Sequence, residues 1–213
     1  MRIDIWSDIV CPFCLIGKTE LATALSNFPY ADEVRIALRA FELDPGKKGN
    51  HGPVVDHLVA KYGLTREQAE QSNHQVAQRA ASLGLQFNWR QAQDASTHDA
   101  HRLVKAASAD GVGPQVEAAL MAGFFTGAQD VSDRAVLTGL ATRAGLDPGR
   151  VAEVLGSDAY SDDVRADEAE ARRLGISGVP FFLFEGKYGV SGAQSAATFG
   201  QALGQVWQLT HAA

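Results

Sequence analysis

The chain opens on a short apolar run that passes directly into a helical pattern. Residues 2–10, RIDIWSDIV, are mostly apolar and stop just before Pro12, which predicts a short buried strand. Beyond Pro12 the apolar positions take up helical spacing, since Cys14, Leu21 and Leu25 fall at i, i+7 and i+11. Proline suits the first turn of such a helix, because the backbone N–H that it lacks would have no partner there. We therefore predict a strand that leads straight into a helix.

The middle of the chain is predicted to be helical. A second apolar run at residues 34–43, VRIALRAFEL, predicts another strand before this region begins. From about Gly49 to Gly175 the apolar spacing is helical and the sequence is rich in Ala, Gln, Glu and Arg. Helices are predicted over residues 54–62, 66–83, 97–108, 114–127, 133–144, 148–155 and 161–174. Glycines directly after several of these runs fit the position that ends a helix.

The last forty or so residues return to a strand pattern. Residues 181–184 and 188–191 predict a β-hairpin around a Glu-Gly turn, and a last helix follows. The order is thus β, α, β, a large helical block, β, β, α. This order predicts an α/β core interrupted by a helical domain. We assign residues 1–48 and 175–213 to the two halves of the core and residues 49–174 to the inserted domain.

Composition excludes several classes of protein. The chain has 213 residues, of which 46% are hydrophobic, so it buries a core without needing disulfides for folding. Its net charge of −6 argues against nucleic acid as a partner, because phosphates are bound by clustered Lys and Arg. No apolar window approaches the ~18 residues of a membrane span. The first residues lack a signal-peptide pattern, so we expect a reducing, cytoplasmic location if Met1 is the true start.

The chain has two cysteines, Cys11 and Cys14, and both fall at the seam between the first strand and the first helix. A helix amino terminus presents unpaired N–H groups and a positive dipole end, which favour a thiolate over a thiol. We predict Cys11, the outer residue, as a nucleophile and Cys14, on the apolar face, as the thiol that resolves a mixed disulfide. Two inert core cysteines are the alternative. A zinc site is not expected, because about four ligands are needed and no second cysteine pair exists.

A second candidate feature is the dipeptide Val179-Pro180, at the start of a predicted strand. Proline removes a donor from a sheet, so it is confined to edges, bulges or first positions. A cis bond here would turn the backbone towards the thiols and leave the Val179 N–H and C=O free for a substrate strand. Cis bonds are the minority for X–Pro in general, so the residues alone favour trans.

Three segments together resemble a known family. WSDIVCPFC, GVPFFLFEGKYGVSGAQ and STHDAHRL are similar to the DsbA-type thioredoxin-like proteins, in particular the FrnE-like branch. The resemblance implies a thioredoxin-like fold, a central mixed sheet with flanking helices, interrupted by a large all-helical inserted domain. It also implies thiol–disulfide oxidoreductase activity on protein or small-molecule thiols and disulfides, with a redox-active cysteine pair in place of a bound cofactor. The catalytic roles fall on Cys11, Cys14 and a cis-proline at Pro180.

The chain departs from its better-known relatives in the dipeptide between the cysteines. Periplasmic members have a histidine where this chain has Phe13. Phenylalanine cannot stabilise a thiolate by charge or hydrogen bonding, so we expect a less oxidising pair. A related branch, the hydroxychromene-carboxylate isomerases and kappa-class glutathione transferases, has serine in place of Cys11. The presence of both thiols favours redox chemistry here. It leaves glutathione open as a co-substrate. Two other functions remain as alternatives: a glutathione-dependent isomerase or transferase, and a redox-inactive binding or chaperone module.

One predicted helix carries a row of basic side chains. His98, His101, Arg102 and Lys105 fall at i, i+3, i+4 and i+7 and therefore share a face. Such a stripe is most often a solvated helix face. The alternative is a cationic patch over the thiols that would bind an acidic ligand such as glutathione. The residues predicted to bind substrate are Pro12, Phe13, Val179, His98 and Arg102.

Another predicted helix has its acids early and its bases late. Asp163, Asp167 and Glu168 precede Arg172 and Arg173, an order that suits the helix dipole. We interpret this segment as an exposed helix.

Overall fold

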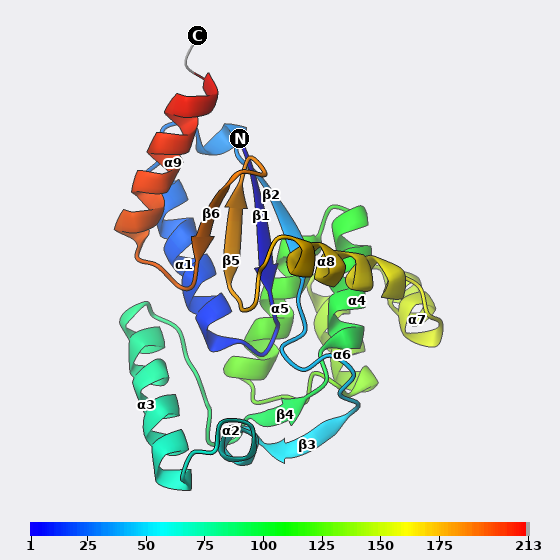
Figure 1. Cartoon of the computed structure of the whole chain (residues 1–213). Coiled ribbons are helices and arrows are strands. Elements are labelled where there is room, and N and C mark those ends of the chain that lie inside the picture. Colours follow the sequence, from blue (N-terminus) through cyan, green and yellow to red (C-terminus); the bar gives the residue numbers. More distant parts are fainter. Residues whose placement is uncertain (212–213) are drawn as a thin grey trace.

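A four-stranded mixed sheet forms the centre of the protein (Figure 1). The structure is a computed structural model, which describes residues 1–211. The strands are β1 (Arg2–Ser7), β2 (Arg35–Ala40), β5 (Phe181–Phe184) and β6 (Tyr188–Ser191), in the order β2-β1-β5-β6 across the sheet. β1 runs parallel to β2 and antiparallel to β5, and β5 runs antiparallel to β6. The sheet therefore joins segments from opposite ends of the chain, as the sequence predicts.

Helices surround the sheet and fill the long segment between β2 and β5. Within residues 1–211 they are α1 (Pro12–Ser26), η1 (Ala31–Glu33), α2 (Val54–Tyr62), α3 (Arg66–Ser82), α4 (His98–Ala109), α5 (Gly113–Phe125), α6 (Arg134–Arg143), α7 (Pro148–Gly156), α8 (Ser161–Arg173) and α9 (Ala196–His211). The predicted helices differ from these by at most two residues at either end.

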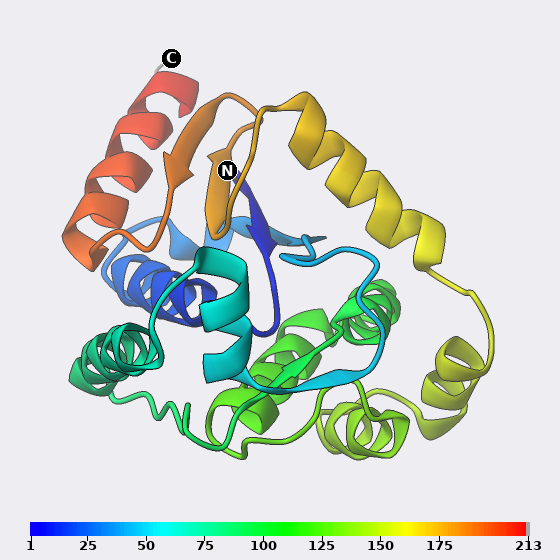
Figure 2. The same cartoon turned by 60° about the horizontal axis from the view of Figure 1, so that its bottom comes forward.

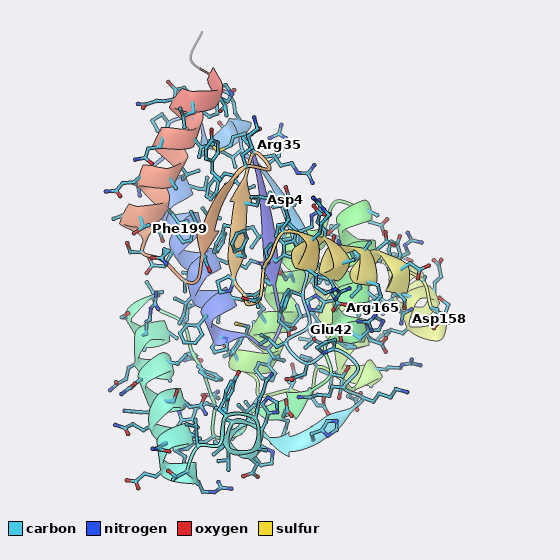
Figure 3. All side chains as sticks on the ribbon, viewed as in Figure 1. Asp4, Arg35, Glu42, Asp158, Arg165 and Phe199 are labelled. Carbon is cyan, nitrogen blue, oxygen red and sulfur yellow. The ribbon has the colours of Figure 1, made fainter. Side chains whose placement is uncertain are left out.

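Both faces of β1 are covered by helices, which explains its nearly continuous apolar sequence. Successive side chains of a strand point to opposite faces of the sheet. Ile3 and Ile5 pack against α1 and α9, where Phe199 projects from α9 towards the sheet (Figure 3). Trp6 points the other way and packs against Ala171 of α8. The sheet is thus the middle layer of three.

The helices between β2 and β5 have an apolar core that extends as far as the loop after β1. Leu103, Phe124 and Leu137 of α4, α5 and α6 are fully or almost fully buried in it. The same cluster includes Ile9 and Cys14, which follow β1. In Figures 1 and 2 these helices lie beyond the end of β1 that leads into α1. The loop after β1 therefore lies between the sheet and the helical block.

The inserted segment is not entirely helical, contrary to the prediction. β3 (Asn50–Pro53) and β4 (Gln93–Ala95) form a separate antiparallel ribbon, extended by a hydrogen bond from Ser96 N–H to the Gly49 carbonyl (2.9 Å). The sequence Asn-His-Gly-Pro lacks apolar alternation and contains a proline, so no local signal marks it as a strand. Pairing with a segment some forty residues away creates this ribbon.

Local signals set several helix boundaries. Gly63 follows α2 with φ of 65°, the left-handed conformation that commonly ends a helix. α3 begins with a capping box, in which Thr65 and Gln68 each bond the backbone of the other through their side chains. Within residues 1–211, every helix falls short of the length and apolar character that crossing a membrane requires.

Candidate active site

Cys11 occupies the amino-terminal cap of α1. A hydrogen bond from the Cys11 N–H to the Asp8 carbonyl (3.2 Å) closes the turn that leads from β1 into Pro12. The Cys11 carbonyl then accepts the first helical bond, from the Cys14 N–H at 3.0 Å. The side chain of Cys11 makes no capping bond to the helix. Its thiol therefore lies at the helix end whose dipole and unpaired N–H groups favour an anion.

The two thiols are free and differ in their surroundings. Cys11 is 4% exposed and Cys14 is fully buried at 0%. Burial raises the pKa of the Cys14 thiol well above its usual value, and hydrogen bonding and charge from Cys11 raise it further. Cys14 is thus held in its protonated form next to Cys11, which is the arrangement expected of a resolving thiol.

The loop before β5 approaches Cys11 from the other half of the core. The Val179–Pro180 peptide bond is cis. The Cys11 thiol donates a hydrogen bond to the Val179 carbonyl, with Sγ 3.6 Å from the oxygen. The cysteine pair and the Val179-Pro180 segment, which are far apart in the sequence, therefore lie side by side in the fold.

Gly17 allows α1 to lie close to this loop. A Cβ atom at this position would be 3.0 Å from Cγ of Pro180 and 3.2 Å from the ring of Phe182. Those distances are shorter than normal van der Waals contacts, so a larger residue would push α1 away from the loop. The glycine in CPFCLIG thus has a packing role that its helical context alone does not reveal.

A buried Asp–His pair supports the loop that carries Cys11. Asp8 is 1% exposed and accepts hydrogen bonds from the N–H groups of Ile9 and Leu43, both at 2.8 Å. His101 of α4 lies 3.0 Å from the same carboxylate through Nε2. These bonds join the loop after β1 to the segment after β2 and to α4.

A partly buried ion pair links α1 to α5. The Lys18 ammonium contacts the Glu117 carboxylate, which also accepts a hydrogen bond from the Ser7 hydroxyl at 2.8 Å. Burial lowers the pKa of Lys18 to about 8, while the charge of Cys14 acts in the opposite direction. Sequence reasoning missed this pair. Lys18 lies four residues after Cys14 on the same helix, but nothing local connects it to Glu117.

A cavity of about 650 Å³ opens beside Cys11. Cys11, Pro12, Phe13 and Val179 line its sheet side. Its other walls come from α2, α3 and the segments that flank them, including Leu58, Val76 and Phe87. Cavities of about 300–1,000 Å³ are typical of small-molecule sites. The residue that we expect to be the nucleophile therefore lines a partly open, mainly apolar space.

A comparison with known families agrees with this geometry. Residues 2–204 match the family described as the DSBA-like thioredoxin domain. The chain belongs to this family. Membership gives this DsbA-like protein a thioredoxin fold and supports thiol–disulfide oxidoreductase chemistry in general terms.

Individual relatives cover nearly the whole chain. A structure described as a "probable DsbA oxidoreductase SCO1869" from Streptomyces coelicolor is 44% identical with a TM-score of 0.93, over 97% of this chain and 90% of its own. The protein YwbO of Bacillus subtilis is 26% identical over 95% of this chain and 96% of its own. The cytosolic disulfide reductase DsbM of Pseudomonas aeruginosa is 20% identical with a TM-score of 0.64, over 98% of this chain and all of its own. DsbM has also been solved with glutathione.

Four of the eight predicted catalytic and substrate-binding residues line the cavity, namely Cys11, Pro12, Phe13 and Val179. The other four, Cys14, Pro180, His98 and Arg102, do not line it. The Arg102 guanidinium is buried against the end of α7, where it donates to the Ala159 carbonyl at 2.8 Å, and it also donates to Asp99 of its own helix at 2.7 Å. His98 bonds Glu42 through Nδ1 at 2.9 Å. Both side chains in this DsbA-like protein therefore have structural partners within the fold.

The basic helix face is not solvated, which corrects the commoner interpretation of that stripe. His101 and Arg102 are 3% and 2% exposed, and Lys105 contacts the Asp167 carboxylate. The predicted exposure of α8 is also wrong for Asp167 and Glu168, which are buried against β2 and the segment after it. Segments far away in the sequence supply the partners that cover these polar residues. The helical pattern therefore could not reveal that they are buried.

Charged residues on the α2 side of the cavity form a network of their own. Lys47 contacts Asp94 at 2.5 Å, Lys61 contacts Asp44 at 2.6 Å, and His57 lies between the two carboxylates at 3.0 and 3.3 Å. Burial lowers the pKa of His57, which the Asp94 charge only partly offsets. Each carboxylate that could hold a metal with His57 is thus already paired with an ammonium group.

Proposed function

We propose that this protein is a thiol–disulfide oxidoreductase that exchanges electrons between its Cys11–Cys14 pair and substrate thiols or disulfides. The single observation that carries the proposal is the geometry at Cys11. This thiol lies at a helix amino terminus, 3.6 Å from the Val179 carbonyl and at the wall of a cavity. Cys14 is buried three residues along the same helix.

In the reducing direction the Cys11 thiolate attacks one sulfur of a substrate disulfide. The substrate S–S bond breaks and a Cys11–substrate disulfide forms. The other substrate sulfur leaves as a thiolate and takes a proton from water. The Val179 carbonyl accepts a hydrogen bond from the Cys11 thiol before reaction, so this loop orients the sulfur that attacks.

Cys14 then releases the bound half of the substrate. Its sulfur attacks the Cys11 sulfur, the Cys11–Cys14 disulfide forms, and the second half of the substrate leaves as a thiolate that takes up the proton from Cys14. The protein has lost two electrons and the substrate disulfide has gained them. The raised pKa of Cys14 keeps it protonated until the mixed disulfide forms. In the oxidising direction the same steps run in reverse.

A thiol of the glutathione class is our proposal for the partner that restores the dithiol. It is supported by the shared fold with DsbM, which was solved with glutathione. Position 13 is phenylalanine and not histidine, so its side chain cannot stabilise the Cys11 thiolate by charge. This favours the reducing direction. The FrnE-like branch and the cytoplasmic location stay predictions from the sequence.

The two cysteine variants test the proposal. Cys11→Ser should lower the rate of dithiol-dependent reduction of insulin or hydroxyethyl disulfide by on the order of 100-fold or more, because the nucleophile is lost. Cys14→Ser should retain the first attack and accumulate a mixed disulfide. Intact-protein mass spectrometry would detect that adduct as the mass of half the substrate, released by excess dithiol.

Each rival function predicts a different result. A redox-inactive binding module would give neither turnover nor a mixed-disulfide adduct in the wild-type protein, in Cys11→Ser or in Cys14→Ser. A glutathione-dependent isomerase would keep its activity in Cys14→Ser without accumulating the adduct. Full reductase activity in Cys11→Ser would contradict the assignment of the nucleophile.

A further inference from the structure

The surroundings of Cys11 restrict which disulfides can reach it. Cys11 is 4% exposed and lines the cavity, and other walls of that cavity come from the hairpin formed by α2 and α3 (residues 54–82). Attack on a disulfide requires the reacting sulfurs to be aligned and roughly 3–3.5 Å apart. A small disulfide can enter the cavity, whereas in a protein disulfide the chain continues on both sides of each sulfur. Access for a protein disulfide therefore requires a wall to move.

The helix α3 has little apolar contact with the rest of the protein. Its buried residues are Ala69, Asn73 and Ala80, and Val76 and Ala77 add partly buried contact. The alanines contribute one methyl group each, and the stabilisation gained from burial grows with apolar area. The Asn73 amide Nδ2 has no hydrogen-bond partner among residues 1–211, so its enclosure costs free energy that hydration would restore. Both features lower the cost of moving α3 outward.

One exposed contact fastens α3 to the half of the protein that contains the sheet. Arg79 Nη2 donates a hydrogen bond to the Ala193 carbonyl at 2.5 Å, in the loop after β6. That loop lies beside α1, because a Cβ atom at Gly17 would be 3.3 Å from Cα of Ala193. Among the described side chains of α3, Arg79 is the one that hydrogen-bonds outside the hairpin. Figure 1 shows α3 at the edge of the molecule, below α1 and α9.

We propose that the α2–α3 hairpin opens to admit protein disulfides to Cys11, and that the contact between Arg79 and Ala193 limits this opening. The inference rests on the proposed function and concerns which substrates reach the same site. Small disulfides react with the closed arrangement, and protein disulfides react with the open one. The exchange steps are those already described, so no further oxidant or reductant is required.

The first test compares a protein disulfide with a small one. The rates of reduction of insulin and of hydroxyethyl disulfide give a ratio for each protein. Arg79→Ala should raise the insulin rate by about threefold to tenfold, because one lost hydrogen bond raises the open population by that factor. The rate with hydroxyethyl disulfide should not change, so the ratio should rise by the same factor.

Two further variants serve as controls. Arg79→Lys keeps a donor at this position and should keep the ratio within about twofold of the wild type. Arg66→Ala removes another exposed arginine of α3, whose ion pair with Asp56 of α2 lies within the hairpin. It should leave the ratio at the wild-type value.

Alkylation of Cys11 measures access without redox chemistry. Proteins that carry Cys14→Ser, with and without Arg79→Ala, are treated with N-ethylmaleimide or with a maleimide on a long polyethylene glycol chain. Each rate constant is divided by that of the same reagent with N-acetylcysteine, which removes differences in intrinsic reactivity. On this scale the polymer should react more slowly than N-ethylmaleimide with the parent protein. Arg79→Ala should speed up the polymer and leave N-ethylmaleimide unchanged.

Several results would overturn the inference. These are an insulin-to-hydroxyethyl-disulfide ratio that Arg79→Ala does not raise, an equal rise with both disulfides, or equal normalised alkylation by the two maleimides in the parent protein. Failure of the proposed function would look different. In that case the wild-type protein would reduce neither disulfide, while the two maleimides would still differ in normalised rate.

Discussion

At the scale of single residues, the two cysteines are both buried but differ in access to the cavity. Both belong to the core of the helical block, yet Cys11 also lines the cavity and Cys14 does not. A thiolate in apolar surroundings is poorly solvated, so burial raises the pKa of Cys14. This difference gives each thiol its own part in the exchange reaction.

The raised pKa of Cys14 predicts a dependence of stability on pH. The unfolded thiol ionises near its ordinary pKa of 9.0, whereas the folded thiol ionises at higher pH. Above about pH 9 the folded state therefore binds more protons than the unfolded state, and the free energy of unfolding falls as pH rises. The reduced wild-type protein should lose up to about 1.4 kcal/mol per pH unit relative to Cys14→Ala over this range.

Urea denaturation in the presence of a reductant, at several pH values between 7 and 10.5, would measure this difference. Below about pH 8 the free energies of unfolding of the wild type and of Cys14→Ala should differ by a constant amount. That amount is set by the cavity that the alanine leaves. A difference that stays constant up to the highest pH would contradict a raised pKa for Cys14.

At the scale of secondary-structure elements, α1 and α5 are joined by a partly buried ion pair. The Glu117 side chain is 4% exposed and that of Lys18 is 21% exposed. Ser7 at the end of β1 bonds the same carboxylate, so three elements meet at one polar contact. Removing one partner of such a pair costs far more than removing both, because a lone buried charge remains.

Lys18→Met should therefore lower the free energy of unfolding by about 3 kcal/mol or more. The double variant Lys18→Met, Glu117→Leu should recover most of that loss. Urea unfolding of both variants and of Glu117→Leu completes a double-mutant cycle. Arg173→Ala, which breaks an exposed ion pair with Glu170, is the matched control and should cost no more than about 1 kcal/mol. Additive effects in the cycle would refute the coupling.

At the scale of the whole molecule, Asp167 of α8 ties the sheet to the helical block. Its carboxylate accepts hydrogen bonds from the Ala40 N–H at 2.8 Å and from Arg39 at 2.9 Å, and it contacts Lys105 of α4. Its carbonyl accepts from the Trp6 indole at 3.0 Å. A similar contact lies nearby, where Arg165 of α8 meets Glu42 (Figure 3). α8 thus connects β1, β2 and α4.

Asp167→Ala should destabilise the protein by about 3 kcal/mol or more, because it leaves a buried N–H and the Lys105 ammonium without their partner. Asp163→Ala, an exposed position on the same helix, should change stability by less than about 0.5 kcal/mol. Thermal and urea unfolding of the two variants would measure both effects. Equal effects of the two substitutions would show that the buried contacts of Asp167 do not stabilise the fold.

The sequence by itself determined the helices, the strands of the central sheet and the cysteine motif, but not the β3–β4 ribbon. Hydrophobic spacing and turn residues act over a few positions, so they placed the helices to within about two residues and put Cys11 at a helix start. Local propensity also marked Val179-Pro180 as the opening of a strand. The α/β order of these elements was enough to predict a core built from both ends of the chain.

Only the tertiary structure decided what the polar residues do. His101 and Arg102 were expected on a solvated or ligand-binding face, but Asp8 and the end of α7 cover them. Glu117 carried no local signal, and it is buried in contact with Ser7 and Lys18, which lie far away in the sequence. Whether a polar side chain on a helix is solvated or paired depends on what packs against it. That information lies in long-range contacts, which periodicity along the chain does not contain.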